Sequence, residues 1–186
     1  MLPIGDVEED ELFLTGYDQS SALATLAPAI SRAERLLLFT KIIMAKPIEY
    51  GIEKLAANQA CYLAQELANL IDTVHNQGLS FDRLTDLVPE EYAVHWQETL
   101  KFLQIITEYW PQILAERQLI DASDRRNRLL RAQIDLWRQN PPGKRIVAAG
   151  TTAAFPLMKE LVKTVLSLEK GELYLAGIDK FLEDEA

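Results

Sequence analysis

Apolar residues recur at steps of three and four over most of the first 140 residues, a spacing typical of amphipathic helices. Ser31 and Glu34 have the spacing of a capping box ahead of a leucine-rich helix, and Pro47 predicts the end of that helix. A longer helix is expected from about Ile52 to Gln77, with Gly78 as its left-handed cap. Its predicted buried stripe comprises Ala56, Ala60, Leu63, Leu67, Leu70 or Ile71, and Val74.

Three more helical stretches are predicted before the Asn140-Pro-Pro-Gly break. A short turn of helix follows Ser80, and Pro89 suits the first turn of the next helix because no amide donor is missed there. Pro111 lies inside that helix and predicts a kink or a split. Its inward residues are expected to be Trp96, Leu100, Leu103, Thr107, Trp110 and Leu114. The last helix opens at residues 121–124 (Asp-Ala-Ser-Asp), with Leu130, Ile134 and Trp137 inward.

The pattern changes after the Pro-Pro-Gly break. Residues 145–150 form a short apolar run that suits a buried strand, and residues 172–177 form a second one. Between them, residues 156–168 read as an amphipathic helix that Gly171 ends. A strand, a helix and a strand within about 35 residues predict a right-handed βαβ unit of a parallel sheet.

This predicted sheet is too small to stand alone. Parallel strands are normally covered by helices on both faces and belong to sheets of several strands. Either the helical region covers it, or we expect the chain to be a segment of a longer protein. The predicted fold class is mainly α with a small α/β part. A helical domain at residues 1–140, with an acidic N-terminal lead, precedes a βαβ fragment at residues 141–186.

Composition narrows the class of protein. The 186 residues are 48% hydrophobic and 25% charged, as in an ordinary soluble globular protein. The single cysteine, Cys61, excludes an internally disulfide-bonded scaffold. No apolar run approaches the ~20 residues that a membrane span needs, and the start of the chain lacks the pattern of a signal peptide. We therefore expect a cytoplasmic protein with no membrane contact.

The charge is unevenly distributed along the chain. The net charge of −9 counts against DNA binding by the whole surface. The window from residue 125 to residue 145 nevertheless has seven basic residues and one acid, Asp135. The basic residues are Arg125, Arg126, Arg128, Arg131, Arg138, Lys144 and Arg145. They form a candidate surface for phosphates or an acidic partner. The alternative is a solvated helix face, helped by an Asp124–Arg128 pair.

Acids gather at both ends of the chain, at residues 6–11 and 183–185. Such short acidic ends are typically solvated tails.

No catalytic motif emerges from the sequence. Gly143-Lys144 is followed by Arg145, where a Walker loop needs Ser or Thr. No lysine has an acid two residues before it, as a restriction-type nuclease would need. One cysteine and two isolated histidines, His75 and His95, exclude a zinc site. Gly150-Thr151 could hold an anion, although a tight turn explains it more simply. We predict no catalytic, metal or cofactor site in this segment.

Several long stretches resemble the AddB subunit of the AddAB helicase-nuclease in its alphaproteobacterial form. They are residues 2–12, 28–31, 95–114, 121–130, Trp137 and 146–151. Two loops depart from the family. It usually has Gly-Ser-Thr-Gly-Ser where this chain has Gly-Thr-Thr-Ala-Ala at 150–154, and Leu-Pro-Gly-Leu-Asp where this chain has Leu-Ala-Gly-Ile-Asp at 175–179.

The resemblance implies a part of the N-terminal helicase-like half of a much longer protein. Residues up to about Asn140 would correspond to domain 1B of superfamily 1 helicases, and the βαβ piece to the RecA-like domain 1A. The family's nuclease site lies near the C-terminus of the full protein, and no residue here matches it. The implied role is non-catalytic, in DNA scanning during double-strand-break repair, with an AddA-type subunit and DNA as partners. The alternative is a stand-alone helical protein-interaction module with an acidic surface.

Overall fold

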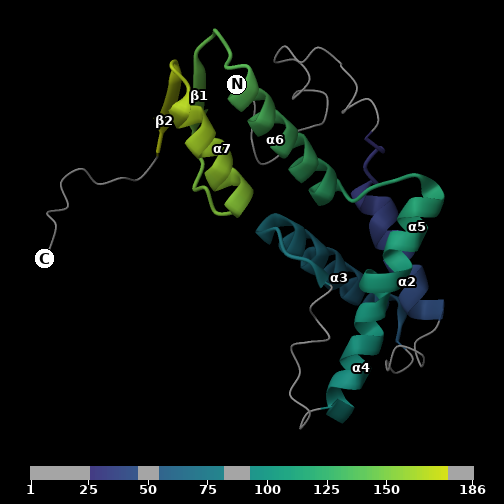
Figure 1. The fold of residues 1–186 in the computed structure, drawn as a ribbon. Coiled ribbons are helices and arrows are strands. Elements are labelled where there is room, and N and C mark those ends of the chain that lie inside the picture. Colours follow the sequence, from purple (N-terminus) through teal and green to yellow (C-terminus); the bar gives the residue numbers. More distant parts are fainter. Residues whose placement is uncertain (1–25, 46–54, 82–92, 176–186) are drawn as a thin grey trace, which may run out of the picture. The chain divides into compact units, whose positions relative to one another are not determined.

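The computed structural model describes residues 26–45, 55–81 and 93–175 (Figure 1). In chain order they form α2 (Arg32–Ala45), α3 (Ala57–Gln77), α4 (Ala93–Gln104), the π-helix η3 (Ile105–Tyr109), α5 (Trp110–Arg117), α6 (Ala122–Gln139), β1 (Ile146–Ala149), α7 (Pro156–Ser167) and β2 (Gly171–Tyr174). The predicted class, mainly α with a small α/β part, is confirmed at this level. The predicted roles of Pro47, of Pro89, of the turn after Ser80 and of the acidic ends fall on residues outside the described ranges.

Spatial contacts group the chain into two compact units. The N-terminal unit is Gln19–Asn127, and the described part of the C-terminal unit runs from Arg128 to Leu175. The division falls within α6. This grouping does not test the domain boundary predicted at residue 140, which stays a prediction.

The ends of α2 and α3 follow local capping rules. Ser31 Oγ accepts a hydrogen bond of 3.2 Å from the Glu34 amide, which confirms the serine half of the predicted capping box, whereas the Glu34 carboxylate pairs with Arg117 at 2.8 Å. Gly78 has a φ of 66° and its N–H reaches the carbonyl of His75, as predicted. The predicted start of α3 near Ile52 is wrong. Ala56 is extended and its amide donates to Gln59 Oε1 at 3.0 Å, so the helix begins at Ala57.

Pro111 changes the helix that contains it, as predicted. The turn just before it is the π-helix η3, and the Trp110 N–H bonds to the carbonyl of Ile105, five residues back. Proline lacks an N–H and its ring crowds the preceding turn, so a widened turn relieves both problems. The extra residue shifts the buried face. Ile105 and Ile106 are buried, whereas Thr107, expected to face inward, is only half-buried. The side chain of Trp96 lies outside the described part.

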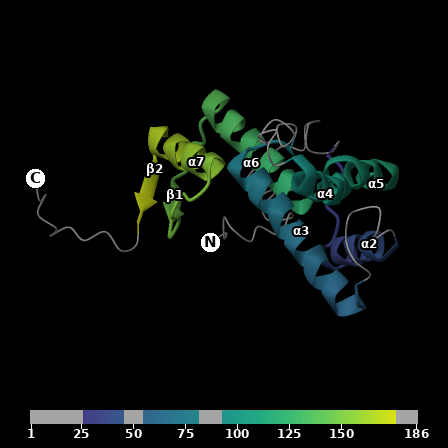
Figure 2. The ribbon, with the colours of Figure 1, turned by 90° about the horizontal axis from the view of Figure 1, so that it is seen from below.

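The core of the N-terminal unit centres on Phe39 and Trp110, whose ring centroids are 4.3 Å apart. Figure 2 shows α2 beside α3, and the two helices pack closely. The small residues Ala60, Ala64 and Ala68 are buried on α3 and permit this approach. Of the two alternatives in the predicted stripe, Ile71 is buried and Leu70 is exposed.

A parallel β-bridge joins two distant segments of the N-terminal unit. It pairs Ala29, just before α2, with Ile120, just before α6. The Ile30 amide donates to the carbonyl of Ile120 at 2.9 Å, and the Ile120 amide donates to that of Pro28 at 3.1 Å. The bridge therefore fixes where α6 begins relative to α2.

The C-terminal unit holds the predicted β-α-β arrangement. The strands β1 and β2 are parallel, in register from Ile146 opposite Gly171 to Ala149 opposite Tyr174. The residues Leu157 and Leu161 of α7 form a buried cluster with Leu130 and Ile134 of α6.

Two predictions about the strands are wrong. They are not buried on both faces, because Val147 and Tyr174 are 47% and 55% exposed, and within the described residues α7 packs on only one face of the sheet. Gly171 does not end α7 either. The helix stops at Ser167, and Gly171 is the first residue of β2.

Candidate nucleic-acid interface

The side chains of the first two arginines of the basic window form hydrogen bonds within the N-terminal unit. The carbonyl of Asp121 accepts from the Arg125 amide at 2.8 Å and so opens α6. The side chain of Arg125 is 7% exposed, and its Nε donates to the carbonyl of Ala27 at 3.0 Å. Arg126 donates to the side-chain oxygen of Asn76. The expectation that Arg125 extends an exposed basic surface is therefore corrected by its burial.

Two arginines of the C-terminal unit are paired with carboxylates. Arg138 lies 2.9 Å from Glu160 of α7, and Arg145 pairs with Glu172 across the two strands. The hydrogen bond from Arg145, followed by that from Tyr174, lowers the pKa of Glu172 below its ordinary value. The guanidinium of Arg138 therefore lies beside α7, and that of Arg145 lies beside the sheet.

The remaining three residues of the basic window, Arg128, Arg131 and Lys144, are exposed. Within the described residues, no ion pair or side-chain hydrogen bond involves Arg131. None of the described residues therefore competes with an outside anion for its guanidinium, and contact with nucleic acid stays a prediction for the window as a whole.

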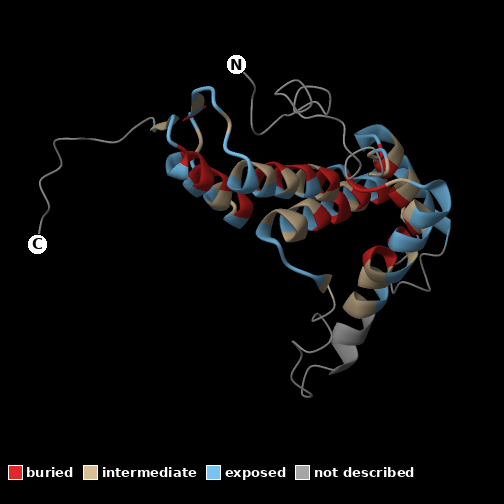
Figure 3. Ribbon diagram, turned by 45° about the horizontal axis from the view of Figure 1, so that its top comes forward, coloured by how far each residue is buried: buried red, intermediate tan, exposed pale blue. Residues whose placement is uncertain are grey.

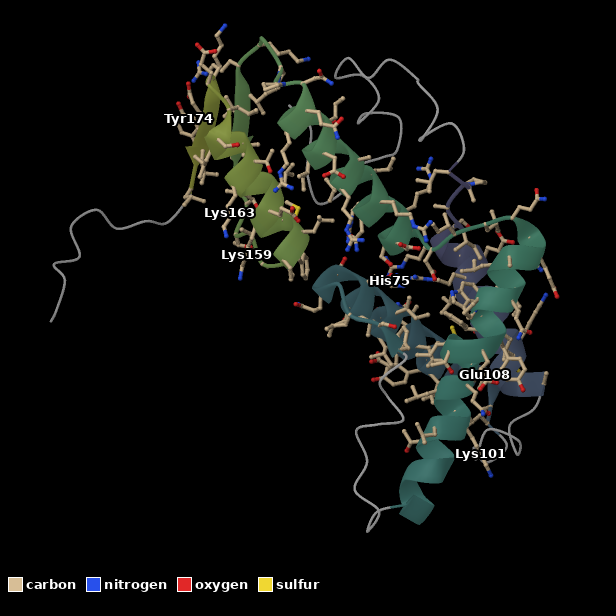
Figure 4. All side chains as sticks on the ribbon, viewed as in Figure 1. His75, Lys101, Glu108, Lys159, Lys163 and Tyr174 are labelled. Atoms are coloured by element: carbon tan, nitrogen blue, oxygen red, sulfur yellow. The ribbon has the colours of Figure 1, made fainter. Side chains whose placement is uncertain are left out.

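The structure adds two basic residues that sequence reasoning missed. Lys159 and Lys163 are exposed on α7 and extend away from α6 (Figure 4). The available signal was their spacing of four residues opposite the apolar positions Leu157 and Leu161. Counting from Arg128 to Leu175 gives eight basic and four acidic residues, a net charge of +4 in a chain of −9.

The loop after β1 forms a tight turn. Gly150 has a φ of 69°, and the amide of Ala153 donates to Thr151 Oγ1 at 3.1 Å. The next helix starts only at Pro156. The local bonds of the loop therefore agree with the simpler of the two interpretations of Gly150-Thr151, a turn that links a strand to a helix.

A buried charged network lies among α2, α3 and the start of α6. Arg35 is 7% exposed and donates to both carboxylate oxygens of Asp72, at 2.9 and 2.7 Å, and to Asp121 Oδ1 at 3.2 Å. Trp110 Nε1 donates to the other oxygen of Asp121 at 2.7 Å. Phe39 is buried one helical turn after Arg35, so both side chains point into the unit. The network ties helices that are far apart in the sequence.

A serine and a histidine meet beside this network without forming a catalytic triad. His75 Nδ1 lies 2.9 Å from Ser123 Oγ, and Ser123 is buried. In a triad, a carboxylate orients the histidine that activates the nucleophile. Here the nearby carboxylate, Asp72, hydrogen-bonds to Arg35 and Ser123. The arrangement fits a structural hydrogen-bond cluster.

Acid is expected to weaken the N-terminal unit through Asp72. Burial opposes ionisation of this carboxyl, but the hydrogen bonds and positive charge of Arg35 outweigh burial, so the pKa of Asp72 lies below its ordinary value. A carboxyl whose pKa is lower in the folded than in the unfolded state stabilises the fold at pH values above its unfolded-state pKa. This stabilisation is lost as the pH falls through the folded-state pKa. We expect the free energy of unfolding, measured in urea, to decrease as the pH drops under about 4. The decrease should be smaller in Asp72→Asn. Equal acid sensitivity in both proteins would contradict this assignment.

Within the described residues, no three His, Cys, Asp or Glu side chains are grouped so that they could hold a metal ion. None of the helices in those same ranges is long and apolar enough to cross a membrane. Comparison of the chain with protein-family models, curated proteins and solved structures finds no match.

Proposed function

We propose that this chain is a non-catalytic, helicase-like segment of a double-strand-break repair helicase-nuclease subunit of the AddB type, and that it contacts the DNA backbone. The observation that carries the proposal is the concentration of positive charge in Arg128–Leu175, +4 in a chain of −9. Neutralising phosphates with Lys and Arg supplies most of the sequence-independent affinity for DNA. Within the described residues, the range Arg128–Leu175 is therefore where local charge favours such contacts.

The loop after β1 supports the likeness to AddB. Ala153 has a φ of 48°, a left-handed conformation that residues other than glycine adopt infrequently. The family's usual Gly-Ser-Thr-Gly-Ser has glycine at this position and at that of Gly150, which has a φ of 69°. The backbone at both positions therefore has the shape that glycine favours.

The exposed face of the small sheet also fits the proposal. Parallel sheets usually carry helices on both faces, whereas Val147 and Tyr174 are exposed here. In the proposed full-length subunit, further strands and helices and an AddA-type partner would cover such surfaces.

The test is a DNA-binding titration by fluorescence anisotropy across a range of salt concentrations. We expect the logarithm of the binding constant to fall linearly with the logarithm of the salt concentration. Arg131→Gln should reduce the magnitude of that slope on duplex DNA by about 0.9, the value for one lost phosphate contact. The matched control is Lys101→Gln, an exposed cation on α4 in the other unit, which should leave the slope unchanged.

Two outcomes would contradict the proposal. Absent or salt-independent DNA binding would favour the stand-alone interaction module. ATP turnover by the pure chain above that of a mock preparation would contradict the non-catalytic role.

A further inference from the structure

The helix α7 has two faces of opposite character. Buried residues are red in Figure 3, and on α7 they include Leu157, Leu161 and Val165, of which the first two pack against α6. Lys159 and Lys163 are exposed on the opposite side, one helical turn apart and so about 6 Å along the axis. The outer face of α7 is therefore a short basic ridge.

Among the residues that the structure describes, no acid pairs with either of the two lysines. The only acid in α7 is Glu160, and its carboxylate pairs with Arg138 of α6 at 2.9 Å. Within the described part of the chain, neither Lys159 nor Lys163 takes part in an ion pair or a side-chain hydrogen bond. Like charges four residues apart on a helix destabilise it by a few tenths of a kcal/mol. A local choice that works against stability is expected mainly at functional positions.

The lysines of α7 are better placed to meet phosphates than the paired arginines are. Arg138 and Arg145 would have to leave Glu160 and Glu172 before they could bind another anion. Lys159 and Lys163 have no such partner to release among the described residues. A lysine is also a point charge on a flexible stem, which suits contact with a backbone of variable geometry.

The composition of α7 argues for duplex backbone over unpaired bases. Proteins that hold single strands usually stack bases on aromatic side chains, and the sequence of α7 contains none. Its exposed apolar residue is Leu166, which offers no ring for stacking. Duplex DNA carries two phosphate strands and the denser charge.

We infer that the outer face of α7, through Lys159 and Lys163, is the principal duplex-backbone contact of the C-terminal unit, ahead of the arginines of α6. This assignment rests on the proposed DNA-binding function. The contact neutralises phosphates without reading sequence, so duplexes of different sequence should bind alike.

The experiment compares Lys159→Gln/Lys163→Gln with the wild-type chain, using labelled duplex and single-stranded oligonucleotides. On the duplex, the double variant should bind about tenfold more weakly at low salt, with a salt slope about 1.8 smaller in magnitude, the value for two lost phosphate contacts. The matched control is Lys41→Gln/Lys101→Gln, which removes the same charge from exposed positions of the N-terminal unit. A thermal melt should show the α7 variant as stable as the wild type or slightly more stable, because repulsion is removed.

The possible failures are distinguishable. If the wild-type chain binds no DNA, the proposed function is overturned, and this inference with it. If the wild type binds and the α7 variant binds equally well, DNA binding stands and the assignment to α7 is overturned. Equal losses in the α7 variant and the control would also overturn it, because net charge alone would explain binding. Stronger binding to single strands would overturn the choice of duplex.

Discussion

Asp121→Asn is expected to lower the free energy of unfolding by about 3–5 kcal/mol. Asp121 is 3% exposed, and its two carboxylate oxygens accept from Arg35 and from Trp110 Nε1. Asparagine has the same shape but no charge, and its amide NH₂ would face one of these donors. The loss would therefore come from a buried cation left with Asp72 as its one remaining carboxylate and from an unsatisfied buried donor, with no cavity involved.

Asp72→Asn is the matched control for Asp121→Asn. It removes the other carboxylate of Arg35, but the side chain of Asp72 is 36% exposed, so water can replace part of the interaction. We expect a loss of about 1–2 kcal/mol. Urea unfolding at neutral pH, followed by tryptophan fluorescence, measures both variants. Equal losses at the two positions would contradict the central role assigned to Asp121.

Gly171→Ala is expected to destabilise the β-α-β part by about 2–3 kcal/mol or more. A Cβ at Gly171 would lie 1.7 Å from the carbonyl oxygen of Val165 and 2.8 Å from its carbonyl carbon. Both atoms belong to the backbone of α7, so no side-chain rotation can relieve the clash. Either the last turn of α7 or the first pairing of β2 with β1 must shift.

The control for Gly171→Ala is Gly143→Ala, in the loop before β1. An added Cβ there meets no atom within 4 Å, and we expect a change between zero and a gain of about 1 kcal/mol. Hydrogen exchange locates the effect. The amides of β1 and β2 should lose protection in the Gly171 variant and keep it in the Gly143 variant. Unchanged protection in both would show that the tight approach at Gly171 is not required.

Elements marked by local chemistry could be predicted from the sequence. The cap at Ser31, the left-handed Gly78 and the end of α6 before Pro141 all depend on residues within a turn of the boundary. The parallel pairing of β1 with β2 follows from their separation by one helix. These features needed no knowledge of distant parts of the chain.

The failures have a different physical origin. The buried face of the helix through Pro111 differs from the predicted one because the π-turn inserts an extra residue. Helix propensity alone does not predict a π-turn. The Arg35 network joins side chains 37 and 86 positions apart in the chain, so no periodicity announces it. The basic window contains Arg138 and Arg145, but nothing in its sequence indicates that Glu160 and Glu172 form ion pairs with them. Only tertiary structure distinguishes a paired arginine from an available lysine.

The bridge between Ala29 and Ile120 has a consequence for synthesis on the ribosome. The segment before α2 cannot complete its pairing until Ile120 has emerged, about 90 residues later. At about 5–20 residues per second, that delay is roughly 5–20 s. During this interval Arg35 lacks the carboxylate of Asp121. For the first part of the interval it also lacks that of Asp72. We therefore expect the N-terminal unit to fold late during translation, with a nascent chain that is protease-sensitive until α6 begins to emerge.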